Sequence, residues 1–83
     1  MTETEIRQAV FDALHQIAPE ADPRQIPPDD NLREALDIDS FDFLNALIAL
    51  HKRLGVEIPE TDYGQLSTLS ALVQYLSGKL EKS

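Results

Sequence analysis

The sequence contains no cysteine and no long apolar segment. Without cysteine, the chain can form no disulfide framework and no thiolate metal site, and it has no thiol chemistry of its own. No apolar run approaches the ~20 residues that span a bilayer, so we expect no stable insertion into a membrane. The opening stretch MTETEIRQAV lacks a basic segment followed by an apolar one, which predicts that no signal peptide is present. Together these absences favour a cytoplasmic protein.

Basic residues are also scarce, with 7 Lys and Arg against 15 Asp and Glu and a formal net charge of −8. Nucleic acid is therefore excluded as a partner, because binding to its phosphate backbone requires clustered Lys and Arg. An anionic membrane surface is disfavoured for the same reason. The complementary partners of such a chain are basic surfaces of other proteins.

The 83 residues, 42% of them hydrophobic, predict one globular domain built from helices. Thr2 begins a T-x-x-E capping box, and apolar residues then recur at helical spacing, which predicts a first helix from about residue 3 to 18. Asp39 or Ser40 is expected to cap a second helix. That helix should end at Gly55, which stands where a C-terminal glycine cap is usual.

A last helix is expected after Ser67 or Thr68, one of which should cap it, with a clean apolar stripe at Leu69, Leu72, Val73, Leu76 and Leu80. A long, proline-rich loop covers residues 19–39, with one short turn at 32–36 and apolar anchors at Ile26, Leu32 and Leu36. A brief helical turn is expected near Glu60–Gln65. The sequence therefore predicts an all-α fold: a small four-helix bundle of three main helices plus one short helix, with a long first loop.

The second helix is more apolar than a helix with a single buried face needs to be. At about 100° per residue, two apolar stripes form on it. Phe43, Leu47, Leu50 and Leu54 make one stripe, and Phe41, Leu44 and Ile48 make the other. Either the helix is wholly buried at the centre of the bundle, or the second stripe is a docking surface for other proteins.

Ser40 stands at the head of this helix, after a segment of strong negative charge. Residues 20–39 contain seven acids against two arginines, a net −5. His51 shares the helical face of Ser40 but lies ~16 Å along the helix, and no G-x-S-x-G elbow is present, so a self-activating catalytic serine is excluded. A plain capping hydroxyl is the alternative role. Read as a calcium loop, the stretch from Asp37 has Phe, Asp and Ile where the loop needs a ligand, a glycine and a glutamate, so no metal site is predicted.

The stretch LDIDSF, at residues 36–41, resembles the L-G-x-D-S-L sequence around the phosphopantetheine attachment serine of acyl carrier proteins. The acidic loop before it, the GVEIP turn and the LSTLSALVQYL segment resemble that family too, so the similarity covers roughly residues 3–80. It implies a single acyl carrier domain, 1–83, and a carrier rather than an enzyme. Two positions depart from the family pattern: Asp37 replaces the usual glycine and Phe41 the usual leucine.

The resemblance implies that Ser40, flanked by Asp39 and Phe41, carries 4′-phosphopantetheine installed from coenzyme A by a phosphopantetheinyl transferase. Acyl groups would then travel as thioesters on that arm, supplied by a ligase or synthase and used by acyltransferases of fatty-acid or other lipid metabolism. The residues expected to contact partner enzymes are Leu44, Asn45, Ile48, His51 and Lys52. The carrier is expected to be a monomer.

The second helix lacks the acidic residues that many family members present to partner enzymes. Asn45, His51 and Lys52 occupy places where glutamate is common in the family, although cations also suit the C-terminal end of any helix. This pattern favours a specialised carrier with a dedicated partner over a general fatty-acid carrier. Two alternatives stay open: an aminoacyl or peptidyl carrier, and a helical adaptor that has lost its modification.

Overall fold

The computed structural model describes residues 2–81 and consists of helices and connecting loops. In chain order the elements are α1 (Glu3–Ile17), the 3₁₀ turn η1 (Pro23–Gln25), α2 (Leu32–Leu36), α3 (Ser40–Leu54), the 3₁₀ turn η2 (Glu60–Gln65) and α4 (Leu69–Glu81). Within the described range there is no β-strand, only an isolated antiparallel bridge between Asn31 and Thr68. The predicted all-α bundle of three main helices and one short helix is confirmed.

Side-chain caps fix where the long helices begin. Thr2 accepts a hydrogen bond from the Glu5 amide, as the capping box predicts, and α1 ends at Ile17, one residue earlier than expected. Asp39 caps α3 by accepting a 2.8 Å hydrogen bond from the Asp42 amide, so Ser40 is the first residue inside the helix. Gly55 ends α3 in the left-handed conformation, with φ of 67°.

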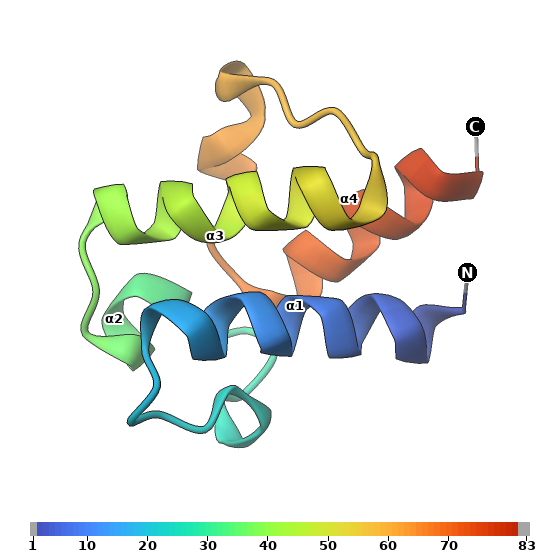
Figure 1. Ribbon diagram of the computed structural model, residues 1–83. Helices are drawn as coiled ribbons and strands as arrows, with labels where there is room; N and C mark the ends of the chain where they lie inside the picture. Colours follow the sequence, from blue (N-terminus) through green and yellow to red (C-terminus); the bar gives the residue numbers. More distant parts are fainter. Residues whose placement is uncertain (1, 82–83) are drawn as a thin grey trace.

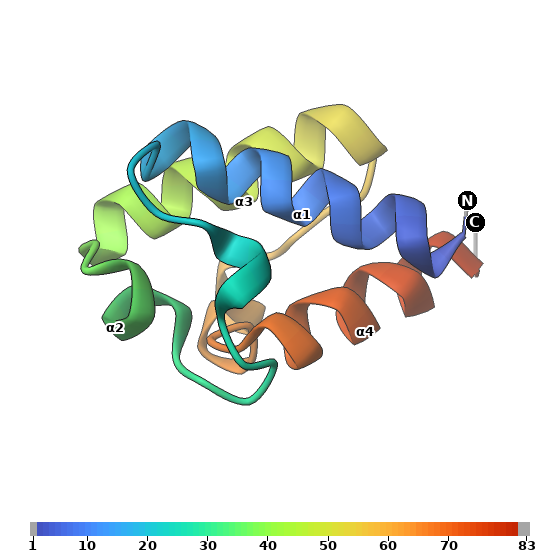
Figure 2. The same cartoon turned by 90° about the horizontal axis from the view of Figure 1, so that it is seen from below.

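Three long helices enclose one apolar core. α1 and α3 lie side by side and run in opposite directions, and α4 packs against α1 (Figures 1 and 2). Their inward faces supply most of the core: Ile6, Ala9, Val10, Ala13, Leu14, Phe43, Ala46, Leu47, Leu50, Leu69, Leu72, Val73 and Leu76, with Leu32, Leu36, Val56 and Leu66 from the connections. Burial of this apolar surface is the main source of stability in so small a domain.

The long first loop is tied to α1 and to the start of α4. The Leu32 amide donates to the Ser67 carbonyl at 2.8 Å, and the Ser70 amide donates to the Pro28 carbonyl at 3.0 Å. Leu32 and Leu36 are buried, as predicted for anchors of this loop, and Ile26 is half-buried against the core. These contacts hold the end of the loop and the beginning of α2 against the start of α4.

The described chain starts and finishes at one end of the molecule. The beginning of α1 and the end of α4 lie together on the right in both views, whereas the beginning of α3 lies at the opposite end (Figures 1 and 2). The longest extent of the molecule is 33 Å.

Candidate functional site at the start of helix α3

Ser40 presents a free hydroxyl at the first position of α3. Its side chain is exposed and makes no hydrogen bond to any described residue. The amides of Ser40 and Phe41 likewise have no acceptor within residues 2–81, as is usual in the first turn of a helix. The alternative that Ser40 serves as the helix cap is wrong, because the Asp39 carboxylate performs that role.

The turn before Ser40 depends on an unusual backbone conformation at Asp37. This residue ends α2 in the left-handed region, with φ of 55° and ψ of 48°, and it is the sole non-glycine residue of the described chain with positive φ. Such a conformation suits glycine best, and Asp adopts it more readily than most residues. The Asp37 and Ile38 amides donate to carbonyls of α2, which fixes the short link to α3.

A pocket of about 160 Å³ opens directly beside Ser40. It lies where α2, α3 and η2 meet, and its lining residues are Arg33, Ser40, Phe43, Leu44, Tyr63, Gly64 and Ser67. The Phe43 ring is buried and forms part of the boundary between this pocket and the core. No histidine lines it, so the pocket offers no serine–histidine pair of the kind that activates a nucleophilic serine.

The η2 wall of the pocket is fastened to α4 by a single side-chain hydrogen bond. The Tyr75 hydroxyl donates to the Asp62 carboxylate at 2.7 Å. Partial burial of the ring and this interaction with Asp62 raise the pKa of Tyr75 from 10.0 to about 12. Lys79 adds a cation–π contact, with its ammonium 5.4 Å from the centre of the Tyr75 ring.

The two apolar stripes of α3 have different environments. Phe43, Leu47 and Leu50 are buried, and Leu54 packs against the core. On the other stripe, Phe41 is 67% exposed and Ile48 39% exposed, and they are the two large hydrophobic residues exposed within residues 2–81. The alternative of a wholly buried helix is therefore wrong. An apolar strip runs along α3 beside Ser40, with half-buried Leu44 between its two exposed residues.

Comparison with known proteins assigns this arrangement to a family. Residues 5–76 match the family model of the phosphopantetheine attachment site. The chain is 34% identical over 76 residues to the acyl carrier protein of Lactobacillus johnsonii, covering 92% of this chain and 94% of that protein. The solution structure of a protein assigned as an acyl carrier protein from Anaplasma phagocytophilum has a TM-score of 0.82 and 25% identity, and covers 95% of this chain and 92% of that one.

The chain belongs to the acyl carrier protein family. A more specialised relative is the meromycolate extension acyl carrier protein of Mycobacterium tuberculosis, 28% identical over 82 residues, which cover 99% of this chain and 70% of that protein. Like its family, the chain is a carrier rather than an enzyme, and its prosthetic group is 4′-phosphopantetheine. When bound, that group supplies a terminal thiol on which acyl groups are carried, which accounts for a carrier without cysteine.

The residues at the start of α3 fit such a group. A phosphodiester on the Ser40 hydroxyl would stand beside the two unpaired amides and at the positive end of the helix dipole. Asp39 lies next to it, but its carboxylate is already engaged by the Asp42 amide. The Ser40 hydroxyl is exposed, so it would be accessible to a modifying enzyme.

The polar residues predicted for docking are distributed along the exposed side of α3. Asn45 and Lys52 are exposed and make no side-chain hydrogen bond or ion pair within the described range. His51 is exposed too, but its Nδ1 lies 2.7 Å from the Val56 carbonyl oxygen and so helps to hold the chain after α3. The sequence did not indicate this local role.

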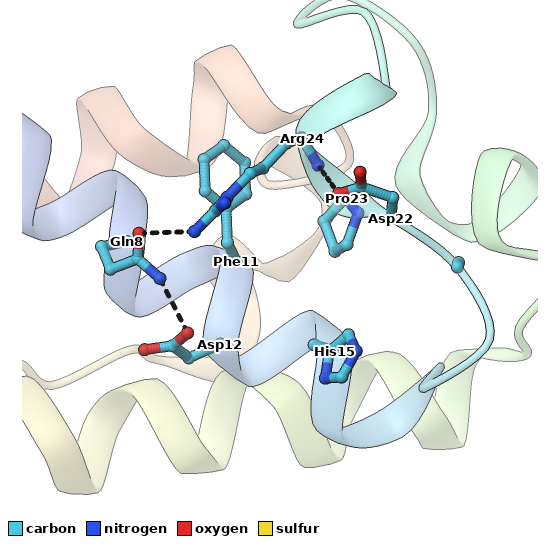
Figure 3. Close-up of a pocket in the computed structure, with 8 residues that line it drawn as sticks. Gln8, Phe11, Asp12, His15, Asp22, Pro23 and Arg24 are labelled. Carbon is cyan, nitrogen blue, oxygen red and sulfur yellow. Dashed lines mark hydrogen bonds between the residues drawn. The ribbon is translucent and has the colours of Figure 1, made fainter.

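Arg53, another cation of α3, faces α1 rather than the apolar strip. Its guanidinium pairs with Asp12 at 2.8 Å, and this interaction, assisted by Gln8, holds the pKa of Asp12 below its ordinary value. Gln8 in turn accepts a hydrogen bond from Arg24 (Figure 3). The chain of contacts joins the first loop to α1 and α3.

The pocket between α1 and η1 is separate from the Ser40 site. It has a volume of about 300 Å³, and Figure 3 shows Asp12, His15 and Arg24 around it. Its hydrogen bonds join η1 to α1. Among residues 2–81 no group of three or more His, Asp or Glu side chains could hold a metal ion, and no helix is long and apolar enough to cross a membrane.

Proposed function

We propose that residues 1–83 form one carrier domain in which Ser40 bears the 4′-phosphopantetheine arm. The observation that carries this assignment is exposure: Ser40 is exposed at a helix N-terminus, whereas Ser67, Ser70 and Ser77 are each partly buried. The Asp-Ser pair and the unpaired amides support it. Because no histidine lines the pocket beside Ser40 and the Asp39 carboxylate is engaged by the Asp42 amide, we expect the phosphopantetheinyl transferase to supply the group that accepts the serine proton.

The partner surface proposed for this carrier is the apolar strip of Phe41, Leu44 and Ile48. A docking enzyme would bury these side chains beside the attachment point of the arm, where apolar contact contributes most to affinity. Lys52 and the neutral Asn45 lie alongside, so the strip lacks the negative charge that would steer a general basic partner. A dedicated acyl-loading ligase, synthase or acyltransferase with an apolar socket for Phe41 fits this surface.

The existence of specialised relatives supports a dedicated role. One relative, from Mycobacterium tuberculosis, is named for meromycolate extension. An aminoacyl or peptidyl load is the second candidate, because the neutral strip is compatible with a carrier outside fatty-acid synthesis. The intact mass of the protein from its native host distinguishes the two, since the mass added beyond phosphopantetheine identifies the load.

Intact-mass measurement after incubation with coenzyme A and a promiscuous transferase tests the attachment site. The wild type should gain one phosphopantetheine group, and Ser40→Ala should gain none. Ser67→Ala is the matched control and should be modified like the wild type. Modification of Ser40→Ala, or no mass gain in the wild type, would overturn the assignment; the latter result would favour the unmodified adaptor.

Substitutions on the exposed side of α3 test the dedicated partner. His51 holds the Val56 carbonyl, so the cleaner variant is Asn45→Glu combined with Lys52→Glu, which leaves that contact intact. It should be acylated faster by general fatty-acid enzymes and served less well by the protein's own partner, with little change in melting temperature. A wild type that already serves the general enzymes as well as the variant would refute specialisation.

A further inference from the structure

Arg33 is the one arginine of this chain whose side chain has no partner among the described residues. Arg7 pairs with Glu3, Arg24 donates to Gln8, and Arg53 pairs with Asp12. Arg33 is exposed on α2 and makes no side-chain hydrogen bond or ion pair within residues 2–81. This is unexpected, since it is the only base in a stretch that contains Asp29, Asp30, Glu34, Asp37 and Asp39.

Arg33 and Ser40 line the same two pockets. Both residues line the pocket of about 160 Å³ against η2. Both also line a second, shallow pocket of about 380 Å³ on the other side, together with Glu34, Asp37 and Asp39. The Arg33 carbonyl accepts a 3.0 Å hydrogen bond from the Ile38 amide, so the backbone of α2 is fixed against the link to α3.

We propose that the Arg33 guanidinium binds the phosphate of the phosphodiester on Ser40 and so positions the root of the arm. The inference rests on the proposed attachment at Ser40. The phosphate would then meet two kinds of donor, the amides of Ser40 and Phe41 and the planar fork of Arg33, whose geometry suits phosphate oxygens.

A contact with Arg33 would offset the repulsion between the phosphate and the acidic residues around Ser40. Glu34, Asp37 and Asp39 line the same shallow pocket as Ser40 and would repel a phosphate there, while Asp42 follows in the first turn of α3. Arg33 opposes that repulsion from the side of α2, where it also borders the pocket of Phe43 and Tyr63. It therefore holds the root of the arm on the pocket side of Ser40 and leaves the exposed Phe41 free for a partner enzyme.

The test compares unmodified and modified protein for the wild type, Arg33→Ala and Arg33→Lys, with Arg7→Ala as the control for loss of an exposed arginine far from the site. Each variant is its own reference, so any effect of the substitution on the unmodified fold cancels. The two readouts are the difference in melting temperature between modified and unmodified forms, and the ³¹P resonance of the modified form.

The quantity compared is the change in melting temperature on modification, taken as modified minus unmodified protein. In Arg33→Ala this change should be about 2–5 °C more negative than in the wild type. This deficit should nearly vanish in about 1 M salt, where exposed charges are screened. The ³¹P resonance should move in Arg33→Ala and less in Arg33→Lys, which retains charge but not the fork. Arg7→Ala should match the wild type in both measurements.

Identical ³¹P resonances and equal melting-temperature differences in Arg33→Ala and Arg7→Ala would overturn the inference while leaving Ser40 as the attachment site. Failure of the wild type to gain mass from coenzyme A would overturn both, since no phosphate would then be present at Ser40. The mass spectrum of each sample therefore separates the two failures.

Discussion

Two phenylalanines of α3, two residues apart, offer a sharp test of how this helix is oriented. Phe43 is 6% exposed and packs in the core, whereas Phe41 is 67% exposed. Truncation of a buried Phe to Ala typically costs ~3–5 kcal/mol. We expect about 3 kcal/mol for Phe43→Ala, at the lower end of that range. The reason is that the ring borders the 160 Å³ pocket, so the space it vacates joins an existing opening.

The assay is urea unfolding followed by circular dichroism, with thermal melting as a second measure. A loss of about 3 kcal/mol should lower the melting temperature by about 15 °C in a domain of this size. Since the whole domain is expected to be stable by only about 4–12 kcal/mol, Phe43→Leu, with a cost of about 1 kcal/mol, is the fallback if the alanine variant does not fold.

Phe41→Ala is the matched control, because it removes the same ring from the same helix. Its cost should be within about 0.5 kcal/mol, as is usual for exposed positions. The effects on partner binding should rank the other way from the effects on stability. Phe41→Ala should weaken binding of the partner far more than the folded variant Phe43→Leu does. A loss under about 1 kcal/mol for Phe43→Ala, or a larger one for Phe41→Ala, would refute the assignment of the two stripes.

Three further outcomes follow from other parts of the structure. Tyr75→Phe should cost about 1 kcal/mol in urea unfolding through loss of its bond to Asp62. Because the fold raises the pKa of Tyr75 from 10.0 to about 12, its contribution is complete below pH 10 and disappears as the pH rises to 12. Parallel pH profiles for variant and wild type in that window would contradict this. Asp37→Gly should stabilise the protein by up to about 1 kcal/mol, because glycine adopts the left-handed conformation without strain. Asp37→Ala removes the same charge and should give no such gain. Equal free energies of unfolding for the two variants would show that backbone strain is not the cause of any gain. Finally, salt or millimolar-scale divalent cations should raise the melting temperature, since residues 20–39 carry a net −5. A flat response would mean that these acids are too far apart to repel.

Local sequence signals were sufficient to predict the helices and their order. The capping box at Thr2, the glycine at the end of α3 and the leucine stripe of α4 each act within a few residues, so they can be read without tertiary information. The periodicity of α3 also placed Phe43 and Phe41 on different stripes, and the packing of the helix decided that Phe43 is buried and Phe41 exposed. Asp39 and Ser40 were equally acceptable caps, and the hydrogen bond to the Asp42 amide decided between them.

The features that the sequence did not predict all join distant segments. The Tyr75–Asp62 bond, the Arg53–Asp12 pair and the pocket shared by α2, α3 and η2 depend on how helices pack, which periodicity alone does not determine. The departure at Asp37 was visible as a missing glycine, and its left-handed backbone explains why glycine is favoured there. No sequence pattern singled out Arg33. Its lack of a side-chain partner among many nearby acids is seen only in the structure.

The placement of Glu3 and Glu81 at the end of the molecule opposite Ser40 has a practical consequence. α3 is 15 residues long, or about 22 Å, and that length separates Ser40 from the end of the molecule where α1 begins and α4 finishes. A fluorophore or surface anchor attached at Glu3 or Glu81 would therefore lie away from Ser40 and from the arm proposed there.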